Sequence, residues 1–302
     1  MAYIHLFIKY TIKFSKEGTM KILVTGANGY LGQGIVKQLL NDGFEVIATD
    51  YCSDFIDNRA TIIESDIFDV DSPYDYFRQP DKLLHLAWKN GFVHSADNHI
   101  ADLPKHVNFI KNCINSGIKE ISILGSMHEI GFFEGSINEN TPTNPMSMYG
   151  IAKNALRQAA TLLCNDNNVP LKWLRGYYIV GNSERGCSIF SKITAAENSG
   201  EKTFPFTMGL NQWDFLDYDA FCTQVAASIE QDEITGIINI CSGRPEKLSE
   251  RVEKFIKDNH YKIKLEYGAF PDRPYDSKAL WGDSKIIEQI MSDYYKKSRR
   301  DN

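Results

Sequence analysis

The sequence predicts an α/β protein, in which a doubly wound parallel sheet is followed by a smaller C-terminal lobe. Between residues 20 and 178, short apolar runs alternate with longer runs of helical period, and this alternation changes after residue 178. Strands that alternate with helices pair in parallel and carry helices on both faces of the sheet. We therefore expect a sheet domain over 20–178, which takes back segments near 213–241, and a lobe formed mainly by 179–295.

The individual elements are predicted from apolar runs and from the residues that end them. Buried strands are expected at 21–25, 44–48, 61–64, 82–87, 118–124 and 171–174. Helices are expected at 31–40, 100–116 and 148–164, the second of which ends at Gly117. In the lobe, we expect helices at 188–198, 219–231, 248–258 and from 284, strands at 236–241 and 262–267, an irregular stretch at 204–214 and a loop at 270–281.

A glycine-rich turn joins the first strand to the first helix. Gly26, Gly29 and Gly32 allow, in turn, a tight bend, a close approach of the backbone to a pyrophosphate, and close packing of helix on strand. The pyrophosphate would lie at a helix N-terminus, which favours negative charge. An acid, Asp50, ends the next strand about twenty residues later, as dinucleotide sites require. An ordinary glycine-rich turn is the alternative, and the complete pattern favours the dinucleotide.

Composition limits the possible partners. The chain has 302 residues, of which 43% are hydrophobic and 24% charged, and its net charge is -6. This balance argues against a nucleic-acid or anionic-membrane partner, although a local basic pocket for a phosphorylated small molecule stays open. Six scattered cysteines form no C-x-x-C pair, which predicts reduced thiols in a cytoplasmic protein and no metal site.

Residues 1–19 form an apolar segment that His5, Lys9 and Lys13 interrupt. It is too short and too interrupted to span a membrane, and it lacks the cleavage site of a signal peptide. Our hypothesis is that Met20 is the natural start, because residues 16–18 can be encoded by a purine run resembling a ribosome-binding site. An additional strand or arm is the alternative. Mass spectrometry of the protein from its own host would decide, and an N-terminus at Met1 would reject the hypothesis.

Three residues could move a proton at the predicted sheet edge. Tyr149 and Lys153 are one turn apart on a predicted helix, so that they share a face. A neighbouring ammonium favours the phenolate and brings the phenol into the range of acid–base catalysis. Ser126 follows the fifth strand and could hydrogen-bond a reacting oxygen. A solvated helix face and a capping serine are the alternative interpretations.

These motifs resemble the extended short-chain dehydrogenase/reductase family, in the branch that acts on nucleotide-diphosphate sugars. The resemblance covers Met20 to about Gln289. It rests on TGANGYLG (25–32), Asp50, SDI (65–67), HLAW (85–88), Ser126 with Gly131, YGIAK (149–153), RGYYIVG (175–181), NICSG (239–243) and RPYD (273–276). HLAW, the Tyr177–Tyr178 pair, Glu129 and ALWGD (279–283) are most similar to 4-keto-6-deoxy-sugar reductases and epimerases.

The resemblance implies a Rossmann sheet domain, a substrate-binding C-terminal lobe and hydride transfer at a sugar carbon, often C4. The implied catalytic residues are Ser126, Tyr149 and Lys153. The expected cofactor-binding residues are Gly26, Gly29, Tyr30, Leu31, Gly32, Asp50, Asp66, Ile67, Leu86, Ala87, Trp88, Tyr149, Lys153 and Tyr177. The expected substrate-binding residues are Lys89, Ser126, His128, Tyr178, Trp213 and Arg273. Asp50 favours NAD over NADP, because its carboxylate would repel a 2′-phosphate.

The departures from the family bear on the reaction. Met127 and His128 stand where dehydratases carry an Asp-Glu pair, so dehydration is disfavoured. His128 could act on a sugar proton or could only shape the pocket. Trp213 replaces an arginine that grips diphosphate. Arg273 matches another arginine of that kind, and a surface ion pair with a neighbouring aspartate is its alternative.

Three functions follow as expectations. The first is NAD(H)-dependent reduction of a 4-keto-6-deoxy nucleotide sugar. The second is a nucleotide-sugar 4-epimerase, which keeps NAD bound and returns the hydride to the other face of the same carbon. The third is a non-catalytic redox sensor, which the retained Tyr149 and Lys153 disfavour. The family also implies a homodimer through the helices that contain Ile100 and Tyr149.

Overall fold

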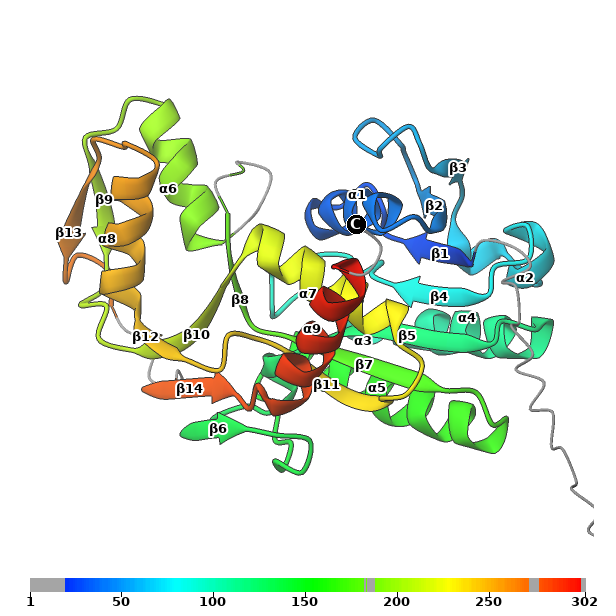
Figure 1. Cartoon of the computed structure of the whole chain (residues 1–302). Helices are drawn as coiled ribbons and strands as arrows, with labels where there is room; N and C mark the ends of the chain where they lie inside the picture. Colours follow the sequence, from blue (N-terminus) through cyan, green and yellow to red (C-terminus); the bar gives the residue numbers. More distant parts are fainter. Residues whose placement is uncertain (1–19, 182, 184–187, 272–276, 300–302) are drawn as a thin grey trace, which may run out of the picture.

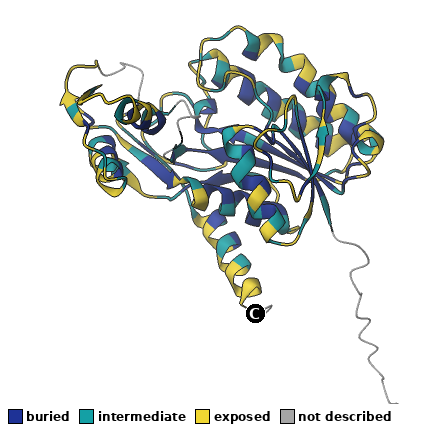
Figure 2. Cartoon of the chain, turned by 90° about the horizontal axis from the view of Figure 1, so that it is seen from above, coloured by how far each residue is buried: buried dark blue, intermediate teal, exposed yellow. Residues whose placement is uncertain are grey.

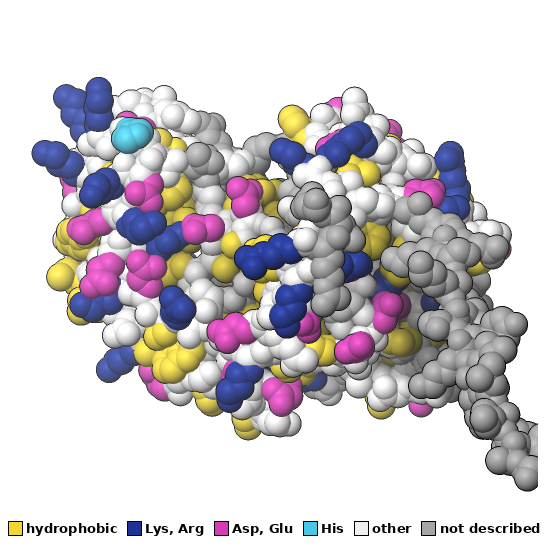
Figure 3. Space-filling view, in the orientation of Figure 1, with side chains coloured by type: hydrophobic (Ala, Val, Ile, Leu, Met, Phe, Trp, Pro, Cys, Tyr) yellow, Lys and Arg dark blue, Asp and Glu magenta, His cyan; other side chains and the backbone are white. Residues whose placement is uncertain are grey.

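The structure is a computed structural model that describes residues 20–181, 183, 188–271 and 277–299. The N-terminal extension and Arg273 therefore lie outside the described residues. Within the described part, two lobes stand side by side, and the seven-stranded sheet forms the larger one (Figure 1). No helix in the described ranges is long and apolar enough to cross a bilayer. On the face shown in Figure 3, basic and acidic side chains are interspersed.

The large sheet has the strand order β11-β7-β5-β4-β1-β2-β3, and every neighbouring pair is parallel. Its strands are β1 (Lys21–Thr25), β2 (Glu45–Asp50), β3 (Thr61–Glu64), β4 (Lys82–His85), β5 (Glu120–Ser126), β7 (Leu171–Gly176) and β11 (Gly236–Ile240). Because helices cover both faces, the inner strands β1 and β4 are buried along nearly their whole length (Figure 2). The predicted doubly wound parallel sheet is confirmed.

Alternate residues of the strands pack against two separate helical layers. Ile22 and Val24 join one cluster with α1 (Tyr30–Asn41), α7 (Tyr218–Glu230) and α9 (Lys285–Ser298). Leu23 joins the other with α4 (Leu103–Ser116) and α5 (Met148–Asp166). Because successive side chains of a strand point to opposite faces of the sheet, each strand contributes to both hydrophobic cores. Short helices α2 (Pro73–Tyr76), η1 (Ile67–Asp69) and η2 (Met127–Glu129) complete the connections.

The smaller lobe is built on a second sheet with the order β12-β10-β14-β6. Its members are β6 (Gly135–Ile137), β10 (Gln212–Asp217), β12 (Pro245–Lys247) and β14 (Ala279–Gly282), and β8 (Tyr178–Val180) also pairs with β10. The helices α6 (Ile189–Asn198) and α8 (Leu248–Asp258) pack against this lobe beside the pair β9 (Thr203–Phe206) and β13 (Lys264–Tyr267). Strand β6 comes from the first half of the chain, and pairs in parallel with β14.

Three of the predicted elements differ from those in the structure. The stretch 204–214, expected to be irregular, contains most of β9 and the start of β10, and the predicted loop at 270–281 contains part of β14. The predicted helix 100–116 is divided at Asp102 into α3 (Asn98–Ala101) and α4. Pro104 lies in the first turn of α4, where its missing N–H costs nothing, whereas a continuous helix would lose a hydrogen bond there.

Candidate active site

The structure brings Ser126, Tyr149 and Lys153 together at the carboxyl edge of the large sheet. Ser126 is the last residue of β5, and α5 begins beside it at Met148. The Ser147 hydroxyl accepts from Gly150 N at 3.1 Å and so caps α5. The side chain of Ser126 lies close enough to Tyr149 to lower the pKa of its phenol, and Lys153 Nζ donates to the Leu124 carbonyl at 2.8 Å. All three side chains therefore face one end of β5.

Burial disfavours the charged form of both titratable groups. It raises the pKa of Tyr149 to about 12, and the nearby side chain of Ser126 partly opposes this shift. It lowers the pKa of Lys153 to about 7, and the negative charge of Glu129 opposes that shift. An uncharged phenol is a proton donor, so the arrangement can supply a proton to an oxygen held beside Ser126.

The glycine turn fits a dinucleotide because no side chain could replace Gly26 or Gly32. Gly26 has φ +70°, and a Cβ there would lie 2.7 Å from Ala87 N. A Cβ on Gly32 would lie 2.2 Å from the Gly26 carbonyl oxygen, so α1 can approach β1 only without one. Gly29 has extended backbone directly before α1. The turn therefore presents bare backbone at the start of a helix, where pyrophosphates bind.

Asp50 lies beside this turn at the end of β2. Its carboxylate accepts from Asn28 N at 3.0 Å and from Tyr51 N at 2.8 Å, which fixes its orientation. Asp66 caps η1 through Phe68 N, and Ile67 is buried there. The other predicted cofactor residues lie along the same sheet edge, except that the Tyr177 side chain points into the core. Leu86 N donates to Thr25 O, which ties the segment after β4 to β1, and Tyr177 Oη donates to Asn239 Oδ1 at 3.3 Å.

A pocket beside Tyr149 gathers three of the six predicted substrate residues, His128, Tyr178 and Trp213. It is lined by His94, Met127, His128, Gly131, Phe132, Met146, Ser147, Tyr178, Trp213, Ser277 and Leu280. Tyr178 and Trp213 stack with ring centroids 4.5 Å apart and planes at 12°, and Trp213 Nε1 donates to the Ser277 carbonyl. Lys89 lies in the loop after β4 and is not part of this lining.

His94 is a pocket residue that the sequence interpretation missed. Its ring lies parallel to that of Tyr149, with centroids 5.2 Å apart, and meets His128 edge-on at 4.2 Å. The His94 carbonyl also accepts from Tyr149 N. His94 lies in an aperiodic loop, where no pattern points to one residue. The available signal was the set of four histidines between 85 and 106, of which His85 lies in the strand that ends at the predicted edge and the other three follow it.

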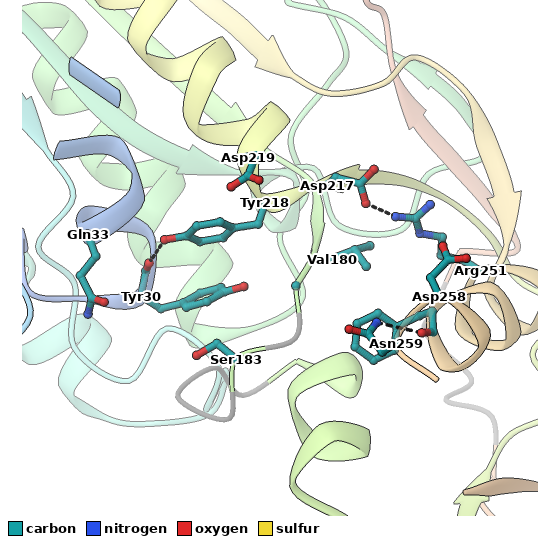
Figure 4. A pocket seen from close by; sticks show the side chains of 12 residues that line it. Tyr30, Gln33, Val180, Ser183, Asp217, Tyr218, Asp219, Arg251, Asp258 and Asn259 are labelled. Carbon is teal, nitrogen blue, oxygen red and sulfur yellow. Dashed lines mark hydrogen bonds and ion pairs between the residues drawn. The ribbon is translucent and has the colours of Figure 1, made fainter. Parts of the chain in front are cut away.

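A larger cavity, of about 420 Å³, is lined by neither His94 nor His128, the two pocket residues whose rings contact Tyr149 (Figure 4). It lies between α8 and Tyr30, whose ring contacts that of Tyr218, at the start of α7, in a tilted arrangement. Three aspartates and one arginine line it, and that arginine, Arg251, pairs with Asp217. Surplus negative charge disfavours a diphosphate. The pocket beside Tyr149 is therefore the candidate active site, although it is smaller.

Comparison with known proteins assigns the chain to a family. The model of the NAD dependent epimerase/dehydratase family matches residues 22–241. The chain is 42% identical, over 270 residues, to the dTDP-6-deoxy-L-talose 4-dehydrogenase (NAD(+)) of Aggregatibacter actinomycetemcomitans, covering 87% of this chain and 99% of that relative. The sheet and glycine turn define an enzyme of the extended short-chain dehydrogenase/reductase class. The chain belongs to the NAD-dependent epimerase/dehydratase family, which confirms the resemblance.

Solved structures confirm the fold. The UDP-N-acetylglucosamine 4-epimerase from Methanobrevibacter ruminantium M1 superposes with a TM-score of 0.79 at 21% identity, covering 90% of this chain and 92% of its own. The UDP-glucuronic acid 4-epimerase from Bacillus cereus, in complex with UDP-glucuronic acid and NAD, superposes with a TM-score of 0.77 at 20% identity, covering 90% and 93%. At these identities the comparison concerns the fold alone.

Proposed function

We propose that this protein is an NAD(H)-dependent oxidoreductase that transfers a hydride at C4 of a nucleotide-diphosphate sugar, and that it reduces a 4-keto-6-deoxy sugar. The observation that carries the proposal is the convergence of Ser126, Tyr149 and Lys153 on the end of β5, next to a glycine turn that accommodates a dinucleotide. The 42% identical relative, a nucleotide-sugar 4-dehydrogenase, supports the choice of carbon.

In the proposed mechanism, Tyr149 gives its proton to the C4 oxygen. Bound NADH supplies the hydride. Ser126 holds the same oxygen by a hydrogen bond and thereby aligns it with the phenol. The Lys153 ammonium stabilises the phenolate that remains and would hold the nicotinamide ribose when the cofactor is bound. Gly26, Gly29, Tyr30, Leu31 and Gly32 are then proposed to hold the pyrophosphate, Asp50 the adenosine ribose, and Asp66 with Ile67 the adenine.

The pocket lining supports a 6-deoxy substrate. Met127, Phe132, Met146 and Leu280 line it as apolar side chains. A methyl group gains from burial against such a surface, whereas a C6 hydroxyl would lose its hydrogen bonds to water without replacement. Met127 and His128 also offer no carboxyl group to catalyse water loss. Reduction of a sugar that is already deoxygenated is therefore favoured over dehydration.

A 4-epimerase is the second candidate, because the matching family model is that of NAD dependent epimerases and dehydratases. The two candidates differ in how they use the dinucleotide. An epimerase returns the hydride to its own substrate and should purify with one NAD per chain, which denaturation releases. A reductase should purify largely empty and consume added NADH.

The test is a screen of nucleotide sugars, each with and without a 4,6-dehydratase, against NADH and NADPH. We expect NADH oxidation, equal to the sugar converted, only when the dehydratase has formed the 4-keto-6-deoxy sugar. Conversion of a sugar without net NADH oxidation would favour the epimerase. If no NADH is oxidised and no sugar is converted with any of the nucleotide sugars, both activities are rejected.

The assembly and compartment are also proposals. Exposed apolar residues at Ile100 on α3 and at Ile151 and Leu162 on α5 support a homodimer through these helices. The described cysteines at 52, 113, 164, 222 and 241 are free thiols, which supports a reducing compartment such as the cytoplasm.

A further inference from the structure

Trp88 contacts Lys153, the residue of the proposed catalytic set whose charged form is most strongly disfavoured by burial. Lys153 Nζ lies 3.9 Å from the centroid of the Trp88 ring, inside the distance at which a cation is attracted to an aromatic face. Lys153 is 3% exposed, and its ammonium also donates to the Leu124 carbonyl. An ammonium without water needs such partners, because its desolvation is otherwise uncompensated. The indole face is therefore a substitute for solvent.

The other surroundings of Lys153 have opposing effects on its pKa. Burial lowers the pKa of Lys153 to about 7, and Glu129 opposes this. The imidazoles of His85 and His106 lie close enough for the Lys153 charge to lower the pKa of each of them, after burial as the main cause. Both are therefore held neutral and do not repel the ammonium. Tyr149, on the same helix face, is itself held neutral by burial.

The indole is itself held in place by histidines. Trp88 Nε1 donates to His99 Nδ1 at 3.1 Å, and the Trp88 ring stacks on His106 with centroids 4.5 Å apart. An indole N–H can only donate, so His99 Nδ1 must carry a lone pair. The His99 proton is then on Nε2, which donates to the Val93 carbonyl at 3.0 Å. One neutral tautomer of His99 thus fits both neighbours.

We propose that Trp88 is a positioning residue that holds the Lys153 ammonium charged and in place, and that His99 fixes the indole for this purpose. The inference rests on the proposed function, because it assigns Lys153 a role in that site. A merely space-filling Trp88 is the competing role, since the side chain also packs against the core under α4 and α5. Space filling depends on volume, whereas support of an ammonium depends on the π face.

The test compares Trp88→Phe, which keeps an aromatic face, with Trp88→Leu, which does not. The first measurement is the titration of Lys153 by NMR of protein with ¹³C-labelled lysine, assigned with Lys153→Arg. We expect the midpoint to fall by about one pH unit in Trp88→Leu and by less in Trp88→Phe. His99→Leu should lower the midpoint of the Lys153 titration as well. His99→Asn, which keeps an acceptor oxygen, should return the midpoint to the wild-type value. Trp281→Leu, on β14, is the matched control and should leave it unchanged.

The second measurement is the pH dependence of turnover with NADH and the 4-keto sugar. Because less of Lys153 stays charged at a given pH, kcat of Trp88→Leu should begin to fall about one pH unit lower, with little change in the KM for the sugar. If Trp88→Leu folds, an unchanged Lys153 titration in it would overturn the inference. If Trp88→Leu does not fold, an unchanged titration in His99→Leu would overturn the inference. The titration needs no substrate, so it remains decisive even if the proposed reaction is wrong.

Discussion

Trp173 donates its indole N–H to both carboxylate oxygens of Glu129, at 2.9 and 3.0 Å. Glu129 is fully buried, and the same carboxylate accepts from Ser126 N at 2.6 Å. The guanidinium groups of Arg157 and Arg175 lie 3.5 and 3.7 Å from it. One buried anion thus connects the end of β5, which carries Ser126, to two cations of neighbouring elements.

We expect Glu129→Gln to lower the free energy of unfolding by about 3–5 kcal/mol, because it leaves buried guanidinium charge without a counter-ion. Urea denaturation measures this loss. Asp57→Asn, which breaks the exposed pair with Arg59, is the control and should change the midpoint little. Equal midpoints for Glu129→Gln and the wild type would show that the buried pairs contribute no net stability.

The pH dependence of the two reaction directions should differ. Burial raises the pKa of Tyr149 to about 12, so the phenol is protonated at neutral pH and can donate during reduction. Oxidation of the alcohol needs the phenolate, so its rate should rise as the pH increases from 6 to 9. Tyr149→Phe should lower kcat about 10²- to 10⁴-fold in both directions. Undiminished turnover by Tyr149→Phe would remove the phenol from the mechanism.

Binding of NADH should take up protons above neutral pH. The pKa of Lys153 is about 7 in the free protein, so at pH 8.5 most molecules carry the neutral amine. Ribose oxygens and pyrophosphate charge favour the ammonium, so the complex binds a proton that the free protein lacks. Below pH 7 the amine is already protonated, and the uptake should vanish. Calorimetry in buffers of different ionisation enthalpy measures it, and Lys153→Met should show none.

Cofactor choice should depend on Asp50. We expect Asp50→Asn to raise kcat/KM with NADPH about tenfold and to lower it with NADH, because the charge that repels a 2′-phosphate is removed. An asparagine oxygen can still accept from Asn28 N, so the glycine turn should be preserved. Asp54→Asn, nearby and exposed, is the matched control. An unchanged ratio of the kcat/KM values for NADPH and NADH would show that other residues determine the cofactor selectivity.

The oligomeric state can be tested on α5. The side chain of Leu162 is 65% exposed, and that of Leu210, in the smaller lobe, is 64% exposed. If α5 forms the dimer interface, Leu162→Arg should produce monomers in light scattering, because it places a charge in an apolar contact. Leu210→Arg should stay dimeric. A wild-type protein that is monomeric at micromolar concentration would reject the proposed homodimer.

The sheet domain was predictable because each buried strand is a continuous apolar run and each long helix has its own period. The glycine turn and the Tyr149–Lys153 spacing are likewise local patterns. Strands β6 and β14 have only three and four residues, too few for any period. They exist because each finds a partner far away in the chain, as between Leu280 and Gly135. Tertiary pairing decided their structure, and propensity did not.

The surroundings of the site residues could be predicted from the sequence less well than the residues themselves. Trp88 was expected at the cofactor, but its contact with Lys153 and its bond to His99 depend on how the loop after β4 folds back on α5. Glu129 served only as a mark of the family, although it accepts the N–H of Ser126. A linear sequence shows which groups are present, whereas burial and tautomer are properties of the packed neighbours.

The sheet of the smaller lobe takes β6 from the first half of the chain and β14 from residues just before the last helix. During synthesis, β6 therefore leaves the ribosome long before its partner exists, and the pocket wall at Leu280 is the last to be completed. Neither lobe can be cut out as a continuous segment without breaking this sheet. A nascent or truncated chain that ends before residue 279 would present the unpaired edges of β6 and β10 to solvent, where other chains could add to them.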